Sequence, residues 1–311
     1  MYAAIDIGTN TIRCLITDSK NNILNPLYVD MKVIRLGENF KKNGIITDAS
    51  IQRLKKALRI YVKKIEEYGI KPDKAVITGT SVLREAPNAL DVKNIVYRES
   101  GLKLNVISGE KEAMITLKGI SSCFNNLNEF YSIDIGGGST EYVCVKNGLP
   151  LWKYSLNMGV VHLSEEFIES DPLSPEDIRR LEREIDLQLG LLKKEILKSG
   201  YVFEPLNLFG TAGTATTLAM VDLETDDYDR NRIHGYFLKR DNVAGIYKRF
   251  IDNKVEDRLS IKGVEKGRED LVPVGAAIML KSLDFFGVSG LTVSECGLME
   301  GLIVNGGEIS L

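Results

Sequence analysis

The sequence predicts an α/β protein of two related lobes, each with a mixed sheet flanked by helices. Three observations support this prediction. The first is a loop that occurs twice, as Asp6-Ile7-Gly8-Thr9-Asn10-Thr11 and, 128 positions later, as Asp134-Ile135-Gly136-Gly137-Gly138-Ser139-Thr140. The second is the apolar, strand-like run that precedes each copy, at 2–5 and at 130–133. The third is the alternation of strand and helix patterns through two halves that begin alike.

The duplicated loop has a composition that suits phosphate. Each copy places one carboxylate at a strand end and follows it with glycines and a hydroxyl residue. Glycine lets successive backbone N–H groups converge on one point, which favours an anion. The aspartate can hold Mg²⁺ or a metal-bound water beside that anion. The two copies therefore predict phosphate chemistry in a cleft, with a chain of phosphates gripped from both sides.

Within the first lobe, strands at 2–7 and 11–18 form a predicted hairpin around the turn Gly8-Thr9-Asn10. Apolar residues at three- and four-residue spacing predict a helix over 48–68, which ends at Gly69. Two further strands, 74–78 and 103–107, lead into 79–84 and into a helix that begins near 108–113.

The second lobe repeats this scheme. Strands at 130–135, 140–145 and 151–155 form a predicted meander around the second loop. A long helix follows, with Ser174 as N-cap, Pro175 at its first position and Gly200 as its stop. A strand at 206–209 runs into Gly210-Thr211-Ala212-Gly213-Thr214, and the tail at 290–301 pairs a strand with a helix start.

Length and composition exclude several classes of protein. A chain of 311 residues is long for one core and suits two lobes. With 27% charged residues and a formal net charge of −3, nothing points to a nucleic-acid or membrane partner. Because the apolar stretches are only strand-sized and no basic region precedes the first motif, we expect a cytoplasmic protein.

The cysteines and histidines show no metal-type spacing. The chain has four scattered cysteines, Cys14, Cys123, Cys144 and Cys296, and two histidines, His162 and His234. We expect the cysteines to be reduced and mostly buried rather than paired in disulfides. We expect both histidines to be structural.

Four segments resemble, in order, the signatures of the exopolyphosphatase/guanosine pentaphosphate phosphatase family: 6–13, 79–84, 108–113 and 134–141. The last, Asp134-Ile135-Gly136-Gly137-Gly138-Ser139-Thr140-Glu141, is the most specific, and matches continue across nearly the whole chain. The resemblance implies two ribonuclease-H-like lobes of the actin-like ATPase superfamily with the active site in the cleft between them. In the family's short, two-domain form, the first lobe would comprise 1–120 with the C-terminal helix 298–311, and the second 121–297.

Position by position, the resemblance implies site residues. Glu112 matches the catalytic carboxylate, which would act as general base on the attacking water. The implied metal ligands are Asp134, Asp6 and Glu141. The implied phosphate-binding residues are Gly8, Thr9, Asn10, Arg13, Arg84, Gly136, Gly137, Gly138, Ser139, Gly210, Thr211, Gly213, Thr214 and Arg268.

The chain departs from the family near its C-terminus. Where relatives read Ser-Asp-x-x-Leu-Arg-Glu-Gly, this chain reads Ser294-Glu295-Cys296-Gly297-Leu298-Met299-Glu300-Gly301. Met299 replaces the arginine and Glu295 lengthens the aspartate. A polyanion contact made there in relatives is therefore not expected here.

The leading hypothesis is an exopolyphosphatase that uses Mg²⁺, or alternatively Mn²⁺, to release orthophosphate from the end of inorganic polyphosphate. The first alternative removes the 5′ γ-phosphate of guanosine pentaphosphate in the same site, with guanosine tetraphosphate as the related ligand. Two other classes stay open: a small-molecule phosphotransferase, and a nucleotide-binding regulator, against which the intact Glu112 argues. Neither nucleic acid nor membrane is an expected partner, and a homodimer is left open.

Overall fold

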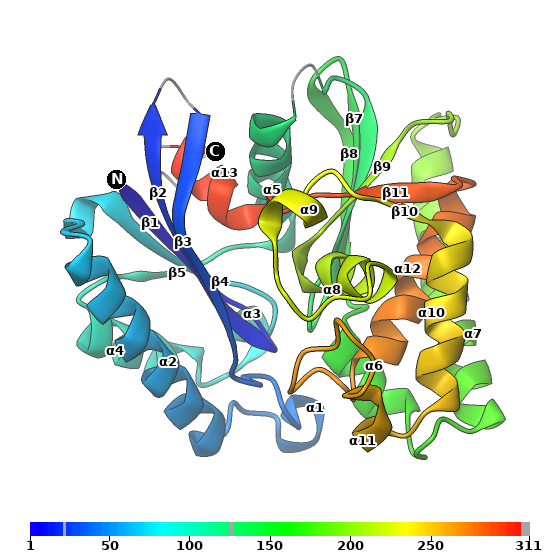
Figure 1. Cartoon of the computed structure of the whole chain (residues 1–311), viewed down its shortest axis with the longest axis horizontal. Helices are drawn as coiled ribbons and strands as arrows, with labels where there is room; N and C mark the ends of the chain where they lie inside the picture. Colours follow the sequence, from blue (N-terminus) through cyan, green and yellow to red (C-terminus); the bar gives the residue numbers. More distant parts are fainter. Residues whose placement is uncertain (21–22, 125–126, 306–311) are drawn as a thin grey trace. The chain divides into compact units, whose positions relative to one another are not determined.

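The computed structural model describes residues 1–20, 23–124 and 127–305, and the chain divides into two compact units (Figure 1). Unit 1 comprises Met1–Asn126 and Cys296–Leu311, and unit 2 comprises Leu127–Glu295. Each unit contains one mixed sheet flanked by helices, which confirms the predicted α/β fold class. The boundaries lie a few residues from those expected from the sequence.

The sheet of unit 1 has five strands in the order β3-β2-β1-β4-β5. The first three strands are antiparallel neighbours, whereas β4 and β5 run parallel to β1. The bounds are β1 (Tyr2–Ile7), β2 (Thr11–Lys20), β3 (Ile23–Val33), β4 (Ala75–Gly79) and β5 (Leu104–Val106). The predicted opening hairpin is confirmed. The edge strand β3 was not predicted because Pro26 interrupts its pattern, although an edge strand tolerates proline.

The longest helix of unit 1, α2, lies where the apolar spacing predicts it. The Thr47 side chain caps it by accepting a hydrogen bond from the Ser50 N–H at 3.3 Å. Its buried residues include Leu54, Leu58 and Tyr61. The described helices of this unit are α1 (Phe40–Asn43), α2 (Asp48–Glu67), η1 (Pro72–Lys74), α3 (Val82–Glu85), α4 (Ala89–Ser100), α5 (Gly109–Cys123) and α13 (Leu298–Val304).

The C-terminal helix α13 returns to unit 1 and packs closely on α5, as Figure 1 shows in red and green. A Cβ atom added at Gly119 would lie 1.9 Å from the backbone oxygen of Gly297. A Cβ atom added at Gly301 would lie 1.8 Å from the backbone oxygen of Ile115. Only glycine therefore permits this approach of the two helices.

The sheet of unit 2 has six strands in the order β10-β11-β9-β6-β7-β8. Its centre is parallel, since β9 pairs in parallel with both β6 and β11, and its two sides are antiparallel. The bounds are β6 (Phe130–Ile135), β7 (Thr140–Lys146), β8 (Leu149–Leu156), β9 (Leu208–Thr211), β10 (Phe237–Lys239) and β11 (Gly290–Val293). The predicted meander around the second loop is confirmed.

The helices of unit 2 cover an apolar core in which Tyr131 stacks on Phe286 with ring centroids 4.4 Å apart. Ser174 and Asp177 form a capping box at the start of α7, where the sequence predicts the N-terminus. The described helices are α6 (Val160–Phe167), α7 (Pro175–Lys198), α8 (Ala212–Asp222), α9 (Arg230–Ile233), α10 (Arg240–Asp252), α11 (Val255–Arg258) and α12 (Val272–Phe286).

The expectation of four reduced cysteines is wrong for one pair. Cys123 and Cys296 form a disulfide, whereas Cys14 and Cys144 are free and buried as expected. The paired residues are separated by 173 positions in the sequence, and their spacing alone gives no sign of contact. They meet because α13 returns to the end of α5.

No helix within residues 1–20, 23–124 and 127–305 is both long enough and apolar enough to cross a membrane.

Candidate active site

The predicted site residues of unit 1 follow the carboxyl ends of its parallel strands. In register, Asp6 of β1 lies beside Thr78 of β4, and Gly79 lies beside Val106 of β5. The loop after β1, the short helix α3 after β4 and the start of α5 after β5 therefore leave the same edge of the sheet. This is the edge at which α/β sheets bind their ligands.

At this edge Arg84 and Glu112 form an ion pair. The Nη1 atom of Arg84 lies 2.7 Å from Oε2 of Glu112 and donates a second hydrogen bond to the Ile107 carbonyl at 3.1 Å. Glu112 lies in the first turn of α5, which the Ser108 side chain caps through the Lys111 N–H. The Glu112 residue is only 8% exposed, so its carboxylate is held in one place and is largely shielded from water.

The loop Gly8-Thr9-Asn10 is fixed through its carbonyl groups. The Gly37 N–H donates to the Thr9 carbonyl at 2.8 Å, and the Ile34 N–H donates to the Asn10 carbonyl at 2.9 Å. Since a peptide unit is planar and trans, a carbonyl turned toward Gly37 sends the next N–H, that of Asn10, the opposite way. The loop thus presents a backbone donor on the side away from its support.

Two buried polar atoms near this loop have no hydrogen-bond partner among the described residues: Oδ1 of Asn10 and Oγ of Ser81. Ser81 also has a positive φ of 20°, and the next N–H, that of Val82, donates to Oγ1 of Thr9 at 3.3 Å. Strained backbone and unsatisfied polar atoms are features of ligand-binding sites. Ser81 is a candidate that the sequence analysis missed, although the Gly79–Arg84 motif contains it.

The triple-glycine loop of unit 2 is built in the same way. The Gly136 N–H donates to the Ser139 carbonyl at 2.9 Å, as the Gly8 N–H does to the Thr11 carbonyl. The first N–H groups of α6, those of Val160 and Val161, donate to the Gly136 and Gly137 carbonyls at 3.0 and 2.8 Å. By peptide planarity the N–H groups of Gly137 and Gly138 point away from α6. The loop therefore offers adjacent donors for an anion.

The two loops differ in the residue opposite the aspartate. In the first hairpin Asp6 pairs with Arg13, whereas in the second Asp134 pairs with Glu141. Directly opposed residues of antiparallel strands place their Cβ atoms about 5 Å apart on one face. Glu141 is 3% exposed and accepts a hydrogen bond from Ser155 Oγ at 2.7 Å. Two neighbouring carboxylates repel unless a cation or proton lies near them, so this pair suits a cation.

No group of three or more histidine, cysteine, aspartate or glutamate side chains that could hold a metal occurs in the part of the chain that the structure describes. Mg²⁺ does not need such a cage, because it keeps several waters and is usually held by one or two carboxylates plus substrate phosphates. The Asp134–Glu141 pair therefore fits Mg²⁺ and does not fit a structural zinc ion.

The predicted loop Gly210–Thr214 lies at the same edge of the second sheet as Asp134. Thr211 is the parallel register partner of Asp134, and Thr214 donates to the Ile135 carbonyl at 3.3 Å. The Ser294 N–H, which follows β11, donates to the Gly210 carbonyl at 2.7 Å. Three strand ends of unit 2 thus bring together the second set of predicted residues.

Arg268 lies against this loop. Its Nη1 atom donates to the Gly213 carbonyl at 3.0 Å and to Oγ1 of Thr217 at 2.8 Å, and it pairs with Glu265 at 3.4 Å. A Cβ atom at Gly213 would lie 1.9 Å from Nη2 of Arg268. The arginine therefore braces the start of α8. Its contact with phosphate stays a prediction, as does that of Arg13.

The two departures near the C-terminus have different surroundings. Met299 belongs to a buried cluster of unit 1 with Leu15 and Ile107, so this position serves the core. Glu295 of unit 2 accepts a hydrogen bond from the Tyr228 hydroxyl, and its N–H donates to Nδ1 of His234 at 3.3 Å. The carboxylate is thus engaged within its own unit.

Comparison with known proteins agrees with the motifs. A model of the Ppx/GppA phosphatase family matches residues 15–307. Of curated relatives, a bifunctional 3-dehydroquinate synthase/phosphatase of Fusobacterium nucleatum is 33% identical over 99% of this chain, which spans only 47% of that protein. Exopolyphosphatase 2 of Mycobacterium tuberculosis is 27% identical over 97% of both chains. The crystal structure of an exopolyphosphatase from Cytophaga hutchinsonii is 26% identical, covers 100% of this chain and 99% of its own, and has a TM-score of 0.90.

Proposed function

The chain belongs to the Ppx/GppA phosphatase family, and on this premise we propose that it hydrolyses the terminal phosphoanhydride of inorganic polyphosphate and releases orthophosphate. The observation that carries the proposal is the ion pair at the strand ends of unit 1 between half-buried Arg84 and buried Glu112. A carboxylate there can accept a proton, and a guanidinium there can bind a phosphate oxygen. A hydrolase of phosphoanhydrides needs both groups.

In the proposed reaction a water oxygen attacks the terminal phosphorus, and the bond to the bridging oxygen breaks. Glu112 accepts the proton that the water loses, and Arg84 holds the oxygens of the transferred phosphoryl group. The glycine loops donate backbone N–H groups to neighbouring phosphates, because these donors are already oriented and need no reorganisation. Phosphoryl transfer makes modest demands on the base, so positioning should contribute most of the rate.

Mg²⁺, with Mn²⁺ as the alternative, would neutralise charge on the phosphate oxygens when bound. Asp134 and Glu141 would hold it, with Asp6 as a further candidate, since carboxylate oxygens are its preferred protein ligands. The register pairing of Asp134 with Glu141 supports this choice.

A second candidate substrate is guanosine pentaphosphate, whose 5′ end is also a phosphoanhydride. The loop Gly210–Thr214, which Arg268 and Ser294 hold in place, favours it because the motif corresponds to the superfamily's nucleotide-side loop. The same catalytic residues would act on either substrate.

The test is phosphate release by wild type and Glu112→Gln with Mg²⁺ and polyphosphate, guanosine pentaphosphate, or ATP plus candidate acceptors. Removing a general base costs about 10²–10⁴-fold in kcat, so we expect the variant to lose polyphosphate hydrolysis. The control is Glu110→Gln, on the same turn but exposed, which should retain it.

The substrate from which phosphate is released distinguishes the candidate functions. A kcat/KM more than about tenfold higher for guanosine pentaphosphate, or roughly 1.4 kcal/mol of discrimination, would favour the second candidate. Phosphate transfer from ATP to an acceptor would favour a phosphotransferase. Absence of release from polyphosphate and from guanosine pentaphosphate, with Mg²⁺ and with Mn²⁺, would contradict both hydrolase proposals.

A further inference from the structure

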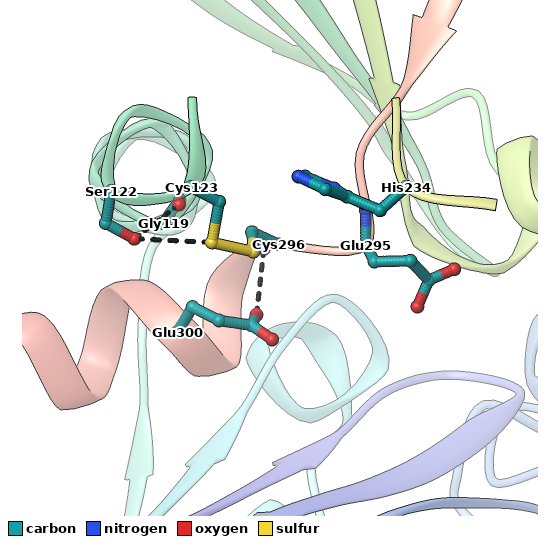
Figure 2. The surroundings of a disulfide bond; sticks show 8 residues. Gly119, Ser122, Cys123, His234, Glu295, Cys296 and Glu300 are labelled. Carbon is teal, nitrogen blue, oxygen red and sulfur yellow. Dashed lines mark hydrogen bonds between the residues drawn. A yellow bond between two sulfur atoms is a disulfide. The ribbon is translucent and has the colours of Figure 1, made fainter. Parts of the chain in front are cut away.

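The disulfide stands beside both places where the chain passes between the units. The chain leaves unit 1 after Asn126 and re-enters it at Cys296. Cys123, the last residue of α5, lies three positions before the first crossing, and Cys296 is the first residue after the second. Their Cα atoms lie 6.3 Å apart (Figure 2). One covalent bond therefore closes a loop that contains the whole of unit 2.

The two cysteines of the bond differ in exposure. Cys123 is partly exposed, with its Sγ 3.7 Å from Oγ of Ser122, whereas Cys296 is 2% exposed. We therefore expect a small dithiol to attack at Cys123, the more exposed of the two residues. Thiol–disulfide exchange proceeds by attack of a thiolate in line with the bond that breaks.

The exchange reaction balances with a dithiol as the reductant. One thiolate of the dithiol attacks Cys123 Sγ, the Sγ–Sγ bond breaks, and Cys296 leaves as a thiolate that takes up a proton. The second thiolate then attacks the mixed disulfide, which releases Cys123 and closes the oxidised dithiol. Two electrons and two protons pass from the dithiol to the protein.

Reduction should leave unit 1 folded. The α5 and α13 helices are held together by the close approach at Gly119 and Gly301, and by an apolar cluster that includes Ile115 and Leu302. These contacts do not depend on the disulfide. Figure 2 shows the bond at the end of this interface, where α5 stops and α13 has not yet begun. What the bond adds is a covalent limit on the separation of the two crossings.

The same helix joins this bond to the proposed chemistry. Helix α5 carries Glu112 in its first turn and Cys123 as its last residue. In addition, unit 2 contains the triple-glycine loop, and the two ends of unit 2 follow Cys123 and precede Cys296 closely in the sequence. Loosening this end of α5 and the two crossings should therefore increase the conformational freedom that substrate binding must remove.

We propose that Cys123–Cys296 is a redox-reversible clasp on the two connections between the units, and that its reduction by a dithiol weakens substrate binding. The effect on substrate rests on the proposed function, whereas the effect on the connections does not. Oxidised protein binds polyphosphate with the lower KM. Reduced protein retains its fold and has a higher KM with a smaller change in kcat.

The remaining cysteines give a low background for the test. Burial, together with the nearby Asp30 carboxylate, raises the pKa of Cys14 to about 12, and burial raises the pKa of the Cys144 thiol. Neither should react with iodoacetamide in the native protein. Alkylation after native reduction therefore reports on the clasp.

The test uses wild type with and without dithiothreitol, the Cys123→Ser/Cys296→Ser double variant, and Cys144→Ala as a control that keeps the disulfide. Three measurements are made: alkylated cysteines by mass, hydrogen exchange of peptides 117–124 and 294–301, and kinetics on polyphosphate. We expect reduction to increase exchange in both peptides, to raise KM at least about threefold and to change kcat less than twofold. The double variant should have the exchange and KM of reduced wild type, and dithiothreitol should change neither. Cys144→Ala should respond to dithiothreitol as wild type does.

The outcomes separate the clasp from the activity. Four free thiols in wild type purified without reductant, or exchange that reduction leaves unchanged, would overturn the clasp even in a protein with no phosphatase activity. Increased exchange with an unchanged KM would overturn the link to substrate binding. Increased exchange together with a raised KM would support both.

Discussion

The two glycine loops are alike in backbone and differ in charge. Both hairpins close with an N–H to carbonyl bond of 2.9 Å, from Gly8 to Thr11 in unit 1 and from Gly136 to Ser139 in unit 2. Yet the aspartate at the strand end faces Arg13 in the first hairpin and Glu141 in the second. A duplicated backbone thus supports two electrostatic environments, one with an arginine opposite the carboxylate and one with a second carboxylate opposite it.

This difference indicates a division of labour. The unit 2 loop, with two carboxylates and adjacent N–H donors, suits a phosphate that is bound together with a cation. The unit 1 loop lies beside the Arg84–Glu112 pair and suits proton transfer and positioning.

The largest effect should come from unit 1. Replacing Arg84 by alanine removes the proposed phosphate clamp and leaves Glu112 without this ion-pair partner, so kcat/KM on polyphosphate should fall about 10³-fold, or roughly 4 kcal/mol. Arg84→Lys should recover only part of this loss, since lysine cannot form two parallel bonds. Steady-state kinetics decide the matter, and a loss below about tenfold for Arg84→Ala would show that the clamp lies elsewhere.

A smaller effect, on the free energy of unfolding, is expected when the glycine that packs against each loop is replaced by alanine. A Cβ atom at Gly159 would lie 2.3 Å from the Gly138 backbone, whereas one at Gly37 would have side-chain atoms as its nearest neighbours, the first from Thr9 at 2.4 Å. Backbone cannot move aside without displacing the loop, so Gly159→Ala should lower the free energy of unfolding by about 3 kcal/mol. Gly37→Ala, which disturbs the bond between Thr9 and Val82, should cost about 1 kcal/mol. Urea unfolding followed by circular dichroism measures both, and the reverse order would refute this reading.

A further difference is a pH dependence of the cap of α7 in unit 2. Burial raises the pKa of Asp177, but hydrogen bonds from Ser170 and Ser174, together with Arg180, outweigh it and lower the pKa to about 2. Ionised Asp177 therefore stabilises the fold above pH 4, and that contribution, about 2 kcal/mol, is lost as the pH falls toward 2. Helix α2 of unit 1 is capped by the Thr47 hydroxyl, which does not titrate in this pH range.

The single tryptophan, Trp152, lies in unit 2 and reports its unfolding by fluorescence. Between pH 5 and pH 2 the wild type should lose about 2 kcal/mol more than Asp177→Asn, which has no titrating group at this position. Equal losses in the two proteins would show that Asp177 does not carry the acid sensitivity.

Local signals predicted much of this architecture. Apolar periodicity placed α2, and the Ser174-Pro175 signature placed the start of α7, because these features depend on neighbours in the chain. The loop motifs placed Arg84 and Glu112 after strand ends, and parallel strands then brought them to one edge. The resemblance to a family supplied the roles of these residues.

Other features depend on contacts between distant segments, which no local pattern encodes. The pairing of Cys123 with Cys296 requires α13 to return to α5, and the burial of Met299 follows from the same return. Arg268 was expected at phosphate, but the sequence could not show that it lies against Gly213. Ser81 was missed because its backbone strain and its buried hydroxyl are visible only in three dimensions.

The division of labour is tested most directly by Mg²⁺ titration of polyphosphate hydrolysis in wild type, Asp134→Asn and Asp6→Asn. The substitutions are matched in chemistry and in hairpin position, and differ in the opposite residue, Glu141 or Arg13. We expect Asp134→Asn to raise the half-saturating Mg²⁺ concentration at least about tenfold, or roughly 1.4 kcal/mol, and Asp6→Asn to raise it less than threefold. An equal shift in both variants, or a larger shift in Asp6→Asn, would contradict the assignment of the cation to unit 2.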